Sequence, residues 1–258
     1  MNTSSSPVLA VRHVSRRYRT VQSGDEVVAL APMSLDIHRG DRVGVVGESG
    51  SGKTTLIRLL AGLDRPTTGT VEFRNAPLDT VARHHFRRAV QVVFQDPRAS
   101  LDPAMSVGAS IAEPVACLRR GTNSKKRAEA VAALVGLEPA LLARRPVHLS
   151  GGQCQRAAIA RAIACEPEVL LADEPVSALD AAIREEVLDV LDRLTTTLGT
   201  ALVVVSHDLS SVVRLCRDVL VLHTGTVVAR GPIGATLGAS DEPHVQRLMT
   251  SLPRLETR

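Results

Sequence analysis

A glycine-rich segment near residue 50 constrains the fold of this chain more than any other feature. It reads Gly47-Glu48-Ser49-Gly50-Ser51-Gly52-Lys53-Thr54, which matches the pattern G-x-x-x-x-G-K-[ST]. An apolar run at 42–46 precedes it, and a helical pattern at 53–60 follows it. Glycines let the backbone turn tightly, so that successive N–H groups and the positive end of the helix face an anion. Strand, loop and helix in this order predict a phosphate-binding loop rather than a purely structural glycine turn.

Two side chains of this segment have a predicted chemistry of their own. The ammonium of Lys53 is expected to reach the β- and γ-phosphates of a nucleotide, and the hydroxyl of Thr54 is expected to bind Mg²⁺. Lysine is rare in this chain, since only Lys53, Lys125 and Lys126 occur beside many arginines. The compact ammonium suits a phosphate loop better than the bulkier fork of arginine.

A pair of carboxylates ends a second apolar run. Asp173 and Glu174 follow Val169-Leu170-Leu171-Ala172. The carboxyl end of a buried strand is where open α/β sheets bind their ligands. Asp173 is therefore predicted to hold Mg²⁺, and Glu174 to accept a proton from an attacking water. Such a strand end is a weak signal alone, and the phosphate loop makes it a strong one.

A second anion site is predicted at Leu149-Ser150-Gly151-Gly152-Gln153, where another helical pattern begins. Ser150 stands at the cap position, and its hydroxyl, the bare glycine backbone and the helix dipole all favour an anion. Two phosphate-seeking sites in one chain are redundant unless the second covers the nucleotide of another subunit.

The rest of the chain alternates short β-branched runs with longer helical patterns, which predicts an α/β fold with a parallel sheet. An antiparallel sheet is predicted for the first strands. The predicted strands are 8–14, 27–30, 33–37, 42–46, 70–73, 89–94, 169–172, 201–205, 219–222 and 226–230. The predicted helices are 53–60, 106–118, 124–135, 151–165, 179–198 and 209–217, and the tail after residue 232 is a weakly helical appendage.

The composition is that of a globular protein with a large core. Among the 258 residues, 44% are hydrophobic but only three are Phe, one is Tyr and none is Trp, so the core must consist of Leu, Val, Ile and Ala. The formal net charge of +4 is a mild excess, and the arginines are scattered rather than gathered in the basic stripe of a nucleic-acid binder. No metal or disulfide pattern joins Cys117, Cys154, Cys165 and Cys216, which predicts reduced and mostly buried thiols.

No apolar run approaches the ~20 residues of a membrane helix. The polar start of the chain also lacks the apolar core of a signal peptide. We therefore expect a cytosolic protein that reaches a membrane only through a partner.

Taken together, these residues resemble the ATP-binding subunits of ABC transporters over nearly the whole chain. The segment at 47–54 matches Walker A, Asp173-Glu174 the end of Walker B, and Leu149–Gln153 the signature LSGGQ. Three shorter matches lie in family order: Gln95 in Phe94-Gln95-Asp96-Pro97 (Q-loop), Ser177-Ala178-Leu179-Asp180 (D-loop), and His207 in Ser206-His207-Asp208 (switch histidine). The only tyrosine, Tyr18, stands where the family has an aromatic that stacks on adenine, although a buried core tyrosine is the alternative.

A narrower resemblance is to the importers of oligopeptides, dipeptides and nickel. It is carried by Gln95–Pro103, by Ile111-Ala112-Glu113-Pro114 and by Asp173–Asp180. The tail Glu242–Leu248 is only faintly similar to the His-Pro-Tyr-Thr tail of that branch. Cys154 stands in the signature where Arg or Gln is commoner, and a small thiol is not expected to disturb phosphate contacts.

The resemblance implies a P-loop NTPase fold of the ABC type, an α/β core with an N-terminal antiparallel β subdomain and an inserted helical subdomain at about 96–152. We therefore expect a single ATP-binding domain at 8–231 and a short extension at 232–258, and the polar, serine-rich start of the chain predicts a disordered tail at 1–7.

It also implies ATP and Mg²⁺ as ligands and a role for each motif residue. Tyr18 would stack on adenine. The loop Gly47–Thr54 and the next residue, Thr55, would bind the phosphates. The metal would be held by Thr54, Gln95 and Asp173, and the catalytic set would be Glu174, His207, Lys53 and Gln95. In a head-to-tail dimer, Ser150, Gly151, Gly152 and Gln153 would face Walker A of the other chain, and Asp180 would link the two ATP sites.

The implied partners are a second ATP-binding subunit, in a homodimer or heterodimer, and membrane-spanning permease subunits. A permease helix would enter a groove formed by 97–113, and a solute-binding protein would act indirectly, with no nucleic acid. The expected location is the cytoplasmic face of the cell membrane, and the expected cargo is peptides, nickel or a related small solute. A soluble ABC-type ATPase of translation or DNA repair is the alternative, disfavoured because this chain has one ATPase unit without long insertions. An exporter or lipid-release ATPase is disfavoured by the run at 95–103.

Overall fold

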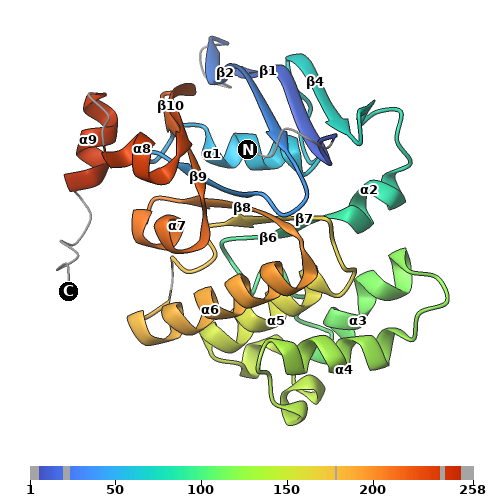
Figure 1. Ribbon diagram of the computed structural model, residues 1–258. Coiled ribbons are helices and arrows are strands. Elements are labelled where there is room, and N and C mark those ends of the chain that lie inside the picture. The colour runs from blue at the N-terminus through green and yellow to red at the C-terminus, as the bar shows by residue number, and fades with distance from the viewer. Residues whose placement is uncertain (1–5, 20–23, 178, 239–241, 251–258) are drawn as a thin grey trace. The chain divides into compact units, whose positions relative to one another are not determined.

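The structure is a computed structural model that describes residues 6–19, 24–177, 179–238 and 242–250 (Figure 1). The chain forms two compact units. The first combines both ends of the sequence, Met1–Thr80 and Val203–Arg258, and the second is Val81–Leu202. The predicted domain limits at 8–231 and 96–152 stay predictions, and much of the predicted tail at 1–7 lies outside the described residues.

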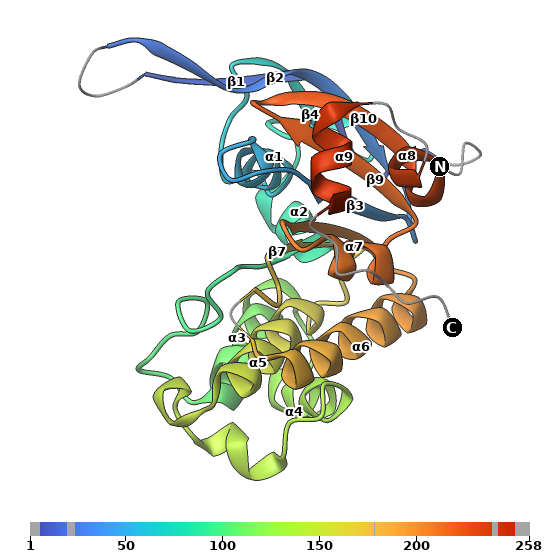
Figure 2. The same ribbon diagram turned by 90° about the vertical axis from the view of Figure 1, so that its left-hand side faces the viewer.

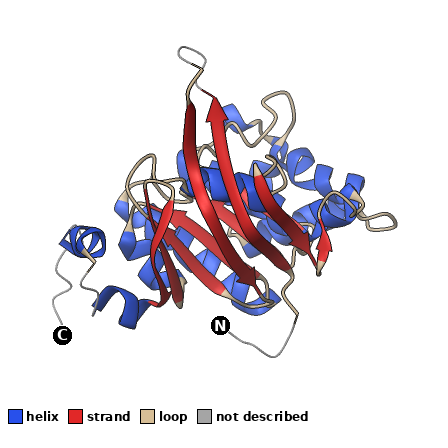
Figure 3. Ribbon diagram, turned by 90° about the horizontal axis from the view of Figure 1, so that it is seen from above, coloured by secondary structure: helices blue, strands red, loops and turns tan. Residues whose placement is uncertain are grey.

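An antiparallel sheet, ordered β2-β1-β4-β5, forms one part of the first unit (Figure 3). Its strands are β1 (Leu9–Arg19), β2 (Glu26–Ile37), β4 (Thr68–Phe73) and β5 (Ala76–Pro77). β1 and β2 form a long two-stranded ribbon, paired from Leu9↔Ile37 to Arg19↔Glu26 (Figure 2). Leu9 on β1 and Ile37 on β2 are fully buried, whereas Val27 and Val28 at the other end of β2 are exposed. The antiparallel sheet predicted for the start of the chain is confirmed.

The prediction of two separate strands at 27–30 and 33–37 is wrong, because β2 runs through both. Pro32 lies between the two predicted runs, and proline is typical of turns. β2 is an edge strand, and between the pairs Val14↔Met33 and Arg16↔Leu30 the register shifts, so Pro32 lies in a β-bulge. Proline lacks an N–H to donate, and edge strands and bulges are the places in a sheet that tolerate this.

The other part of the first unit holds the predicted phosphate loop. β3 (Arg42–Val46) runs parallel to β9 (Asp218–His223), which turns back into β10 (Thr226–Pro232). Helix α1 (Lys53–Leu60) follows β3, and the strand and the helix both have the predicted bounds. α7 (Leu209–Leu215), α8 (Ile233–Gly238) and α9 (Pro243–Thr250) also belong to this unit, so the appendage predicted after residue 232 contains two short helices among its described residues.

The second unit joins two parallel strands to a group of helices. β6 (Val90–Val93) pairs with β7 (Val169–Asp173), starting at Val90↔Val169. The long helices are α3 (Val107–Leu118), α4 (Ser124–Leu134), α5 (Gly151–Ile163) and α6 (Ala181–Leu198), with short 3₁₀ turns at Pro139–Ala143 and Pro146–His148. β8 (Ala201–Ser206) contains the point at which the chain passes from this unit to the first.

Two predictions in the second unit need correction. A strand was predicted for 89–94, but Ala89 ends an unpredicted helix, α2 (Arg83–Ala89), and the strand begins at Val90. The pair His84-His85 and its arginine neighbours carry no apolar periodicity, so nothing in the sequence indicated this helix. Helix α6 begins at Ala181 rather than at 179, because the Asp180 side chain caps it by accepting a hydrogen bond from the N–H of Ile183.

The core has the predicted aliphatic character. Its largest fully buried side chains are all leucine or isoleucine. All four cysteines are free, and only Cys117 among them is exposed, as predicted. Across the residues that the structure describes, no helix combines the length and the apolar character needed to span a membrane.

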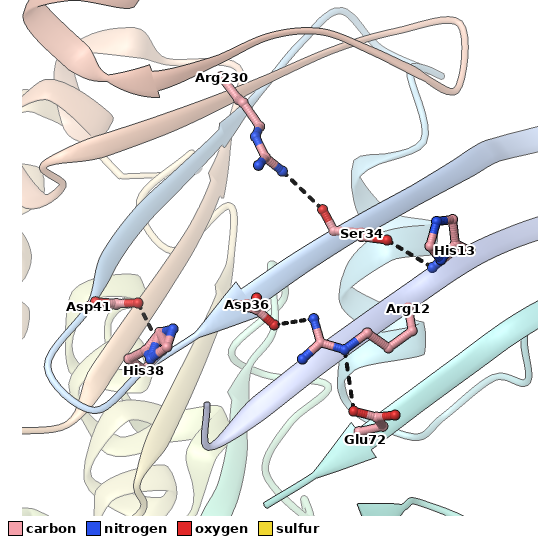
Figure 4. Close-up of polar contacts among 8 residues, drawn as sticks. All are labelled: Arg12, His13, Ser34, Asp36, His38, Asp41, Glu72 and Arg230. Carbon is pink, nitrogen blue, oxygen red and sulfur yellow. Dashed lines mark hydrogen bonds and ion pairs between the residues drawn. The ribbon is translucent and has the colours of Figure 1, made fainter. Parts of the chain in front are cut away.

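The antiparallel sheet contains a cluster of charged side chains (Figure 4). Substitutions there show whether ion pairs or buried apolar side chains contribute more to the stability of the sheet. Arg12 on β1 forms ion pairs with Asp36 on β2 and Glu72 on β4. These side chains are partly exposed to water, so we expect Arg12→Met to lower the free energy of unfolding by less than about 1 kcal/mol, and by less still in high salt. Urea denaturation measures this.

The matched control is Leu35→Ala on β2, where Leu35 is 2% exposed. Loss of a buried leucine costs about 2–5 kcal/mol. A larger loss from Arg12→Met than from Leu35→Ala would show that charge rather than apolar burial holds this sheet.

Candidate functional site

The backbone of the phosphate loop lies so close to its neighbours that two of its glycines cannot be replaced. A Cβ on Gly47 would lie 2.2 Å from the carbonyl oxygen of Leu222 on β9, and a Cβ on Gly52 would lie 2.5 Å from that of Ala29 on β2. Gly52 also has a φ of 102°, which side chains disfavour. The two glycines therefore let the loop between β3 and α1 pack directly against backbone.

Lys53 is buried at the centre of this loop, with 8% of its surface exposed. Its Nζ donates hydrogen bonds to the carbonyl oxygens of Gly47 at 2.7 Å and Glu48 at 2.8 Å. Ser51 is 3% exposed, and within the described residues its Oγ has no hydrogen-bond partner. A buried ammonium and a buried unpartnered hydroxyl are both stabilised by an anion. The residues present therefore fit a phosphate group.

The turn between the predicted strands 219–222 and 226–230 contacts the loop, a role that the sequence did not indicate. The N–H of Gly225, between β9 and β10, donates to the carbonyl of Ser51 at 3.0 Å, and Gly225 accepts from the N–H of Ala31 at 2.8 Å. Thr224 and Gly225 both have positive φ, 43° and 78°. The only signal in the sequence was the short Thr-Gly pair between two apolar runs.

Tyr18, the predicted adenine platform, lies on β1 and is 37% exposed, which excludes the buried-core alternative. Its hydroxyl donates to Asp64 Oδ2 at 2.7 Å, and the guanidinium carbon of Arg16 lies 4.5 Å from the centre of its ring. Burial raises the pKa of the Asp64 carboxyl, but the hydrogen bonds from Tyr18 and from the N–H of Arg65, together with the charge of Arg16, outweigh it, so this pKa lies below its usual value. Asp64 thus stays ionised and holds the ring in place.

The paired carboxylates occupy the carboxyl end of β7 in the second unit, as predicted. Asp173 is the last residue of the strand and is 8% exposed. Glu174 is less buried and has a φ of 50°, a conformation that costs a residue with a side chain about 1–3 kcal/mol. Ser177 stabilises this turn, since its N–H and its Oγ both donate to the carbonyl of Glu174, at 3.3 and 3.2 Å.

The signature segment begins helix α5 through a capping box. The Oγ of Ser150 accepts from the N–H of Gln153 at 3.2 Å, and Gln153 Oε1 accepts from the N–H of Ser150 at 3.0 Å. This reciprocal pair satisfies two N–H groups of the first turn and fixes the conformation of the segment. Cys154 is buried and donates to the carbonyl of Pro146 at 3.5 Å, and burial raises the pKa of its thiol. The neutral thiol therefore faces the protein interior, which agrees with the expectation that it does not disturb phosphate contacts.

The signature helix packs closely against α6. A Cβ on Gly152 would lie 2.4 Å from Cγ2 of Ile183, whereas a Cβ on Gly151 would find its nearest atom, Cδ2 of Leu179, at 3.7 Å. Ile183 lies in the first turn of α6, three residues after the capping residue Asp180. The structure thereby joins two predicted motifs, the signature and the D-loop. Ala178 of the D-loop lies outside the described residues.

Gln95 and His207 each follow a strand and are exposed. Gln95 lies two residues beyond β6, and the turn after it connects to the signature segment, because Arg98 donates to the carbonyl of Leu149 at 3.0 Å. His207 follows β8, and the next residue, Asp208, caps α7. Sequence reasoning missed the contacts of Asp64, Arg98 and Ile183. Arg98 lies in the run Gln95–Pro103 and Ile183 in the predicted helix 179–198, but neither pattern indicated these contacts.

The predicted residues divide between the two units. Tyr18, the loop at 47–55 and His207 belong to the first, and Gln95, the signature segment, Asp173, Glu174 and Asp180 belong to the second.

Comparison with known proteins identifies the family. Residues 30–177, more than half of the chain, match the family described as ABC transporter. The chain belongs to the ABC transporter family. The nickel import ATP-binding protein NikE of Pseudomonas putida is 40% identical over 88% of this ABC family chain and 86% of its own length.

Other relatives of this ABC family chain are longer than it is. The oligopeptide transport ATP-binding protein OppD of Mycobacterium tuberculosis is 39% identical over 97% of the chain, which spans only 42% of OppD. The glutathione import ATP-binding protein GsiA of Salmonella typhimurium is 38% identical over 96% of the chain, which spans 41% of GsiA. These names are of the importer branch that the motifs predict, so the predicted family and branch are confirmed.

Solved structures confirm the fold. The chain is similar to the ATP-binding cassette MJ0796 in a dimeric post-hydrolysis state bound to ADP and Pi, with a TM-score of 0.78 and 30% identity over 87% of this chain and 98% of that one. The predicted ABC-type ATPase fold is therefore that of this chain.

The contact between Gly152 and Ile183 predicts how the signature helix responds to one added methyl group. We expect Gly152→Ala to lower the free energy of unfolding by about 1–3 kcal/mol, because its Cβ would overlap Ile183. Urea denaturation of the two proteins measures the difference.

Gly151→Ala is the matched control. It adds a methyl group to the same helix turn, but this group would lie at ordinary contact distance from Leu179. The free energy of unfolding of the Gly151→Ala variant should therefore stay unchanged or rise, because alanine favours helix more than glycine does. Equal losses in both variants would contradict the close packing of the signature helix on α6.

Proposed function

We propose that this chain is the ATP-binding and ATP-hydrolysing subunit that powers an importer of peptides, nickel or a related small solute. The observation that carries the proposal is the phosphate loop, in a chain of the ABC family. The loop holds the buried ammonium of Lys53 and the hydroxyl of Ser51, which has no hydrogen-bond partner among the residues that the structure describes. The names of the relatives, which are import and transport ATP-binding proteins, support the importer branch.

Binding of ATP rests on the first unit. The N–H groups of Gly47–Thr55 and the ammonium of Lys53 would hold the phosphates, since Lys53 already lies inside the loop. Tyr18 would stack on adenine with the face of its ring that Arg16 does not cover. The bond to Asp64 keeps the phenol ring in one orientation, so little conformational freedom is lost when the base binds.

Thr54, Gln95 and Asp173 would hold Mg²⁺. Hydroxyl, amide and carboxylate oxygens are the ligands that this hard cation prefers. When bound, Mg²⁺ neutralises charge on the phosphate oxygens.

Glu174 would act as the general base of hydrolysis. Its carboxylate would orient the attacking water and take its proton, while His207 holds the water and the γ-phosphate and Gln95 and Lys53 position the reacting groups. The backbone of Glu174 has a positive φ, and a hydrogen bond from Ser177 stabilises this conformation. This supports the role, because strained residues of this kind cluster at active sites.

Two subunits would close head to tail around two ATP molecules. Each signature segment, Ser150–Gln153, would then face Walker A of the other subunit, and Asp180 would link the two sites. The dimeric state of the similar cassette supports such an assembly. The partner would be a second copy of this chain or a different ATP-binding subunit.

The remaining partners would be membrane-spanning permease subunits and, through them, a solute-binding protein. A permease helix would enter the groove formed by 97–113, and this contact would hold the chain at the cytoplasmic face of the cell membrane. ATP binding would close the dimer and hydrolysis would reopen it, a population shift that the permease would couple to uptake.

The catalytic assignment predicts the behaviour of Glu174→Gln. The amide cannot accept the proton, so we expect steady-state hydrolysis to fall by about 10²–10⁴-fold while ATP binding persists. The variant should form an ATP-dependent dimer, which analytical ultracentrifugation with and without ATP measures.

Lys53→Ala is the contrasting variant, expected to lose ATP affinity and therefore the dimer as well. Unchanged affinity in Lys53→Ala would remove the phosphate loop from ATP binding, and retained hydrolysis in Glu174→Gln would remove Glu174 from the role of base.

The importer assignment predicts which proteins purify with the chain. Affinity purification from detergent-solubilised membranes should recover permease subunits with multiple membrane spans, and deletion of the gene should abolish uptake of the cargo. Sedimentation with ribosomes or DNA, and never with membranes, would instead support the soluble ATPase of translation or DNA repair.

A further inference from the structure

The residues directly after Gln95 form a turn of defined shape. Asp96 Oδ1 accepts from two successive N–H groups, the first that of Arg98, at 2.9 and 3.2 Å, and Ser100 Oγ donates to the carbonyl of Asp96 at 3.0 Å. Leu101 is 2% exposed and anchors the end of the turn in the core. The side chain of Arg98 therefore extends from a backbone turn whose conformation is held by hydrogen bonds.

Arg98 connects this turn to the signature segment, 51 residues further along the chain. Its Nη2 donates to the carbonyl oxygen of Leu149 at 3.0 Å. Leu149 is 3% exposed and directly precedes Ser150, the cap of α5. A hydrogen bond from a charged donor is stronger than one between neutral groups, so this contact is well suited to transmit a displacement.

Helix α6 holds the same segment from another side. Gly152 packs against Ile183, which lies in the first turn after Asp180. Within the second unit, the start of α5 is thus held both by the turn after Gln95 and by the helix that Asp180 caps.

We propose that Arg98 is a positioning residue that couples the Gln95 segment to the signature segment of the same chain. The proposal rests on the proposed function. In the proposed dimer, Gln95 serves the ATP of its own subunit, whereas Ser150–Gln153 serve the ATP of the partner subunit. A displacement of the turn after Gln95 reaches the signature through the bond to Leu149, and the two ATP sites are thereby coupled through Arg98.

The test compares three variants, each made in the wild-type chain and in Glu174→Gln. Arg98→Ala removes the bond to Leu149, and Arg98→Lys keeps a charged donor. The matched control is Arg193→Ala, because Arg193 Nη2 donates to another leucine carbonyl of the second unit, that of Leu134, at 2.8 Å. Thermal unfolding is followed for all of them.

We expect Arg98→Ala to leave the ATP affinity of the single subunit unchanged, measured with a fluorescent ATP analogue. In the Glu174→Gln background it should weaken ATP-dependent dimerisation by roughly tenfold, the effect of losing one hydrogen bond to a charged group. Arg98→Lys should recover most of this loss, and Arg193→Ala should dimerise as its parent does.

Three outcomes would overturn the role of Arg98. These are unchanged dimerisation in Arg98→Ala, an equal loss in Arg193→Ala, and loss of ATP binding together with a lowered unfolding temperature, which indicates a merely structural contact.

A nucleotide-free measurement separates this proposal from the proposed function. Hydrogen exchange at the backbone amides of 150–153 should be faster in Arg98→Ala than in wild type, and unchanged in Arg193→Ala. Equal exchange in all three proteins would refute the positioning role whatever the activity. A wild-type chain that neither binds nor hydrolyses ATP would refute the proposed function. If exchange is nevertheless faster in Arg98→Ala, the positioning of the signature segment by the bond from Arg98 to Leu149 is still supported.

Discussion

The fit of the phosphate loop against neighbouring backbone is the constraint on which the chemistry of the first unit depends. Gly47 and Gly52 admit carbonyl oxygens where a Cβ would stand, and the turn at Gly225 donates to the loop from the far end of the sequence. Because its shape is held from outside, the loop can keep Lys53 buried against carbonyl oxygens.

In the second unit, contacts with neighbouring segments likewise hold the signature segment in one conformation. Its capping box satisfies N–H groups of the first turn locally, while Gly152 packs on Ile183 and Leu149 accepts from Arg98. One short segment is thereby connected to two other predicted motifs. The proposed transfer of information between ATP sites needs such connections, because a flexible segment would absorb a displacement instead of passing it on.

Much of the fold could be predicted, and the failures have physical causes. β3 and α1 have their predicted bounds because an apolar run, glycines and a helical pattern mark every junction. Pro32 was misread as a turn because sequence does not reveal that β2 lies at a sheet edge, where a bulge absorbs the missing N–H. Helix α2 was missed because tertiary packing, rather than an apolar stripe, decides short polar helices.

The chemistry of the candidate site is predicted from the sequence alone: which residues would bind phosphate, which oxygens would suit Mg²⁺ and which carboxylate would act as a base. These follow from short motifs, since side-chain type and local spacing carry the signal. The contacts that hold those residues in place became visible only in the folded chain. Tyr18 is bonded to Asp64 across 46 residues and Arg98 to Leu149 across 51, and no local pattern encodes a contact between segments that meet only when the chain packs.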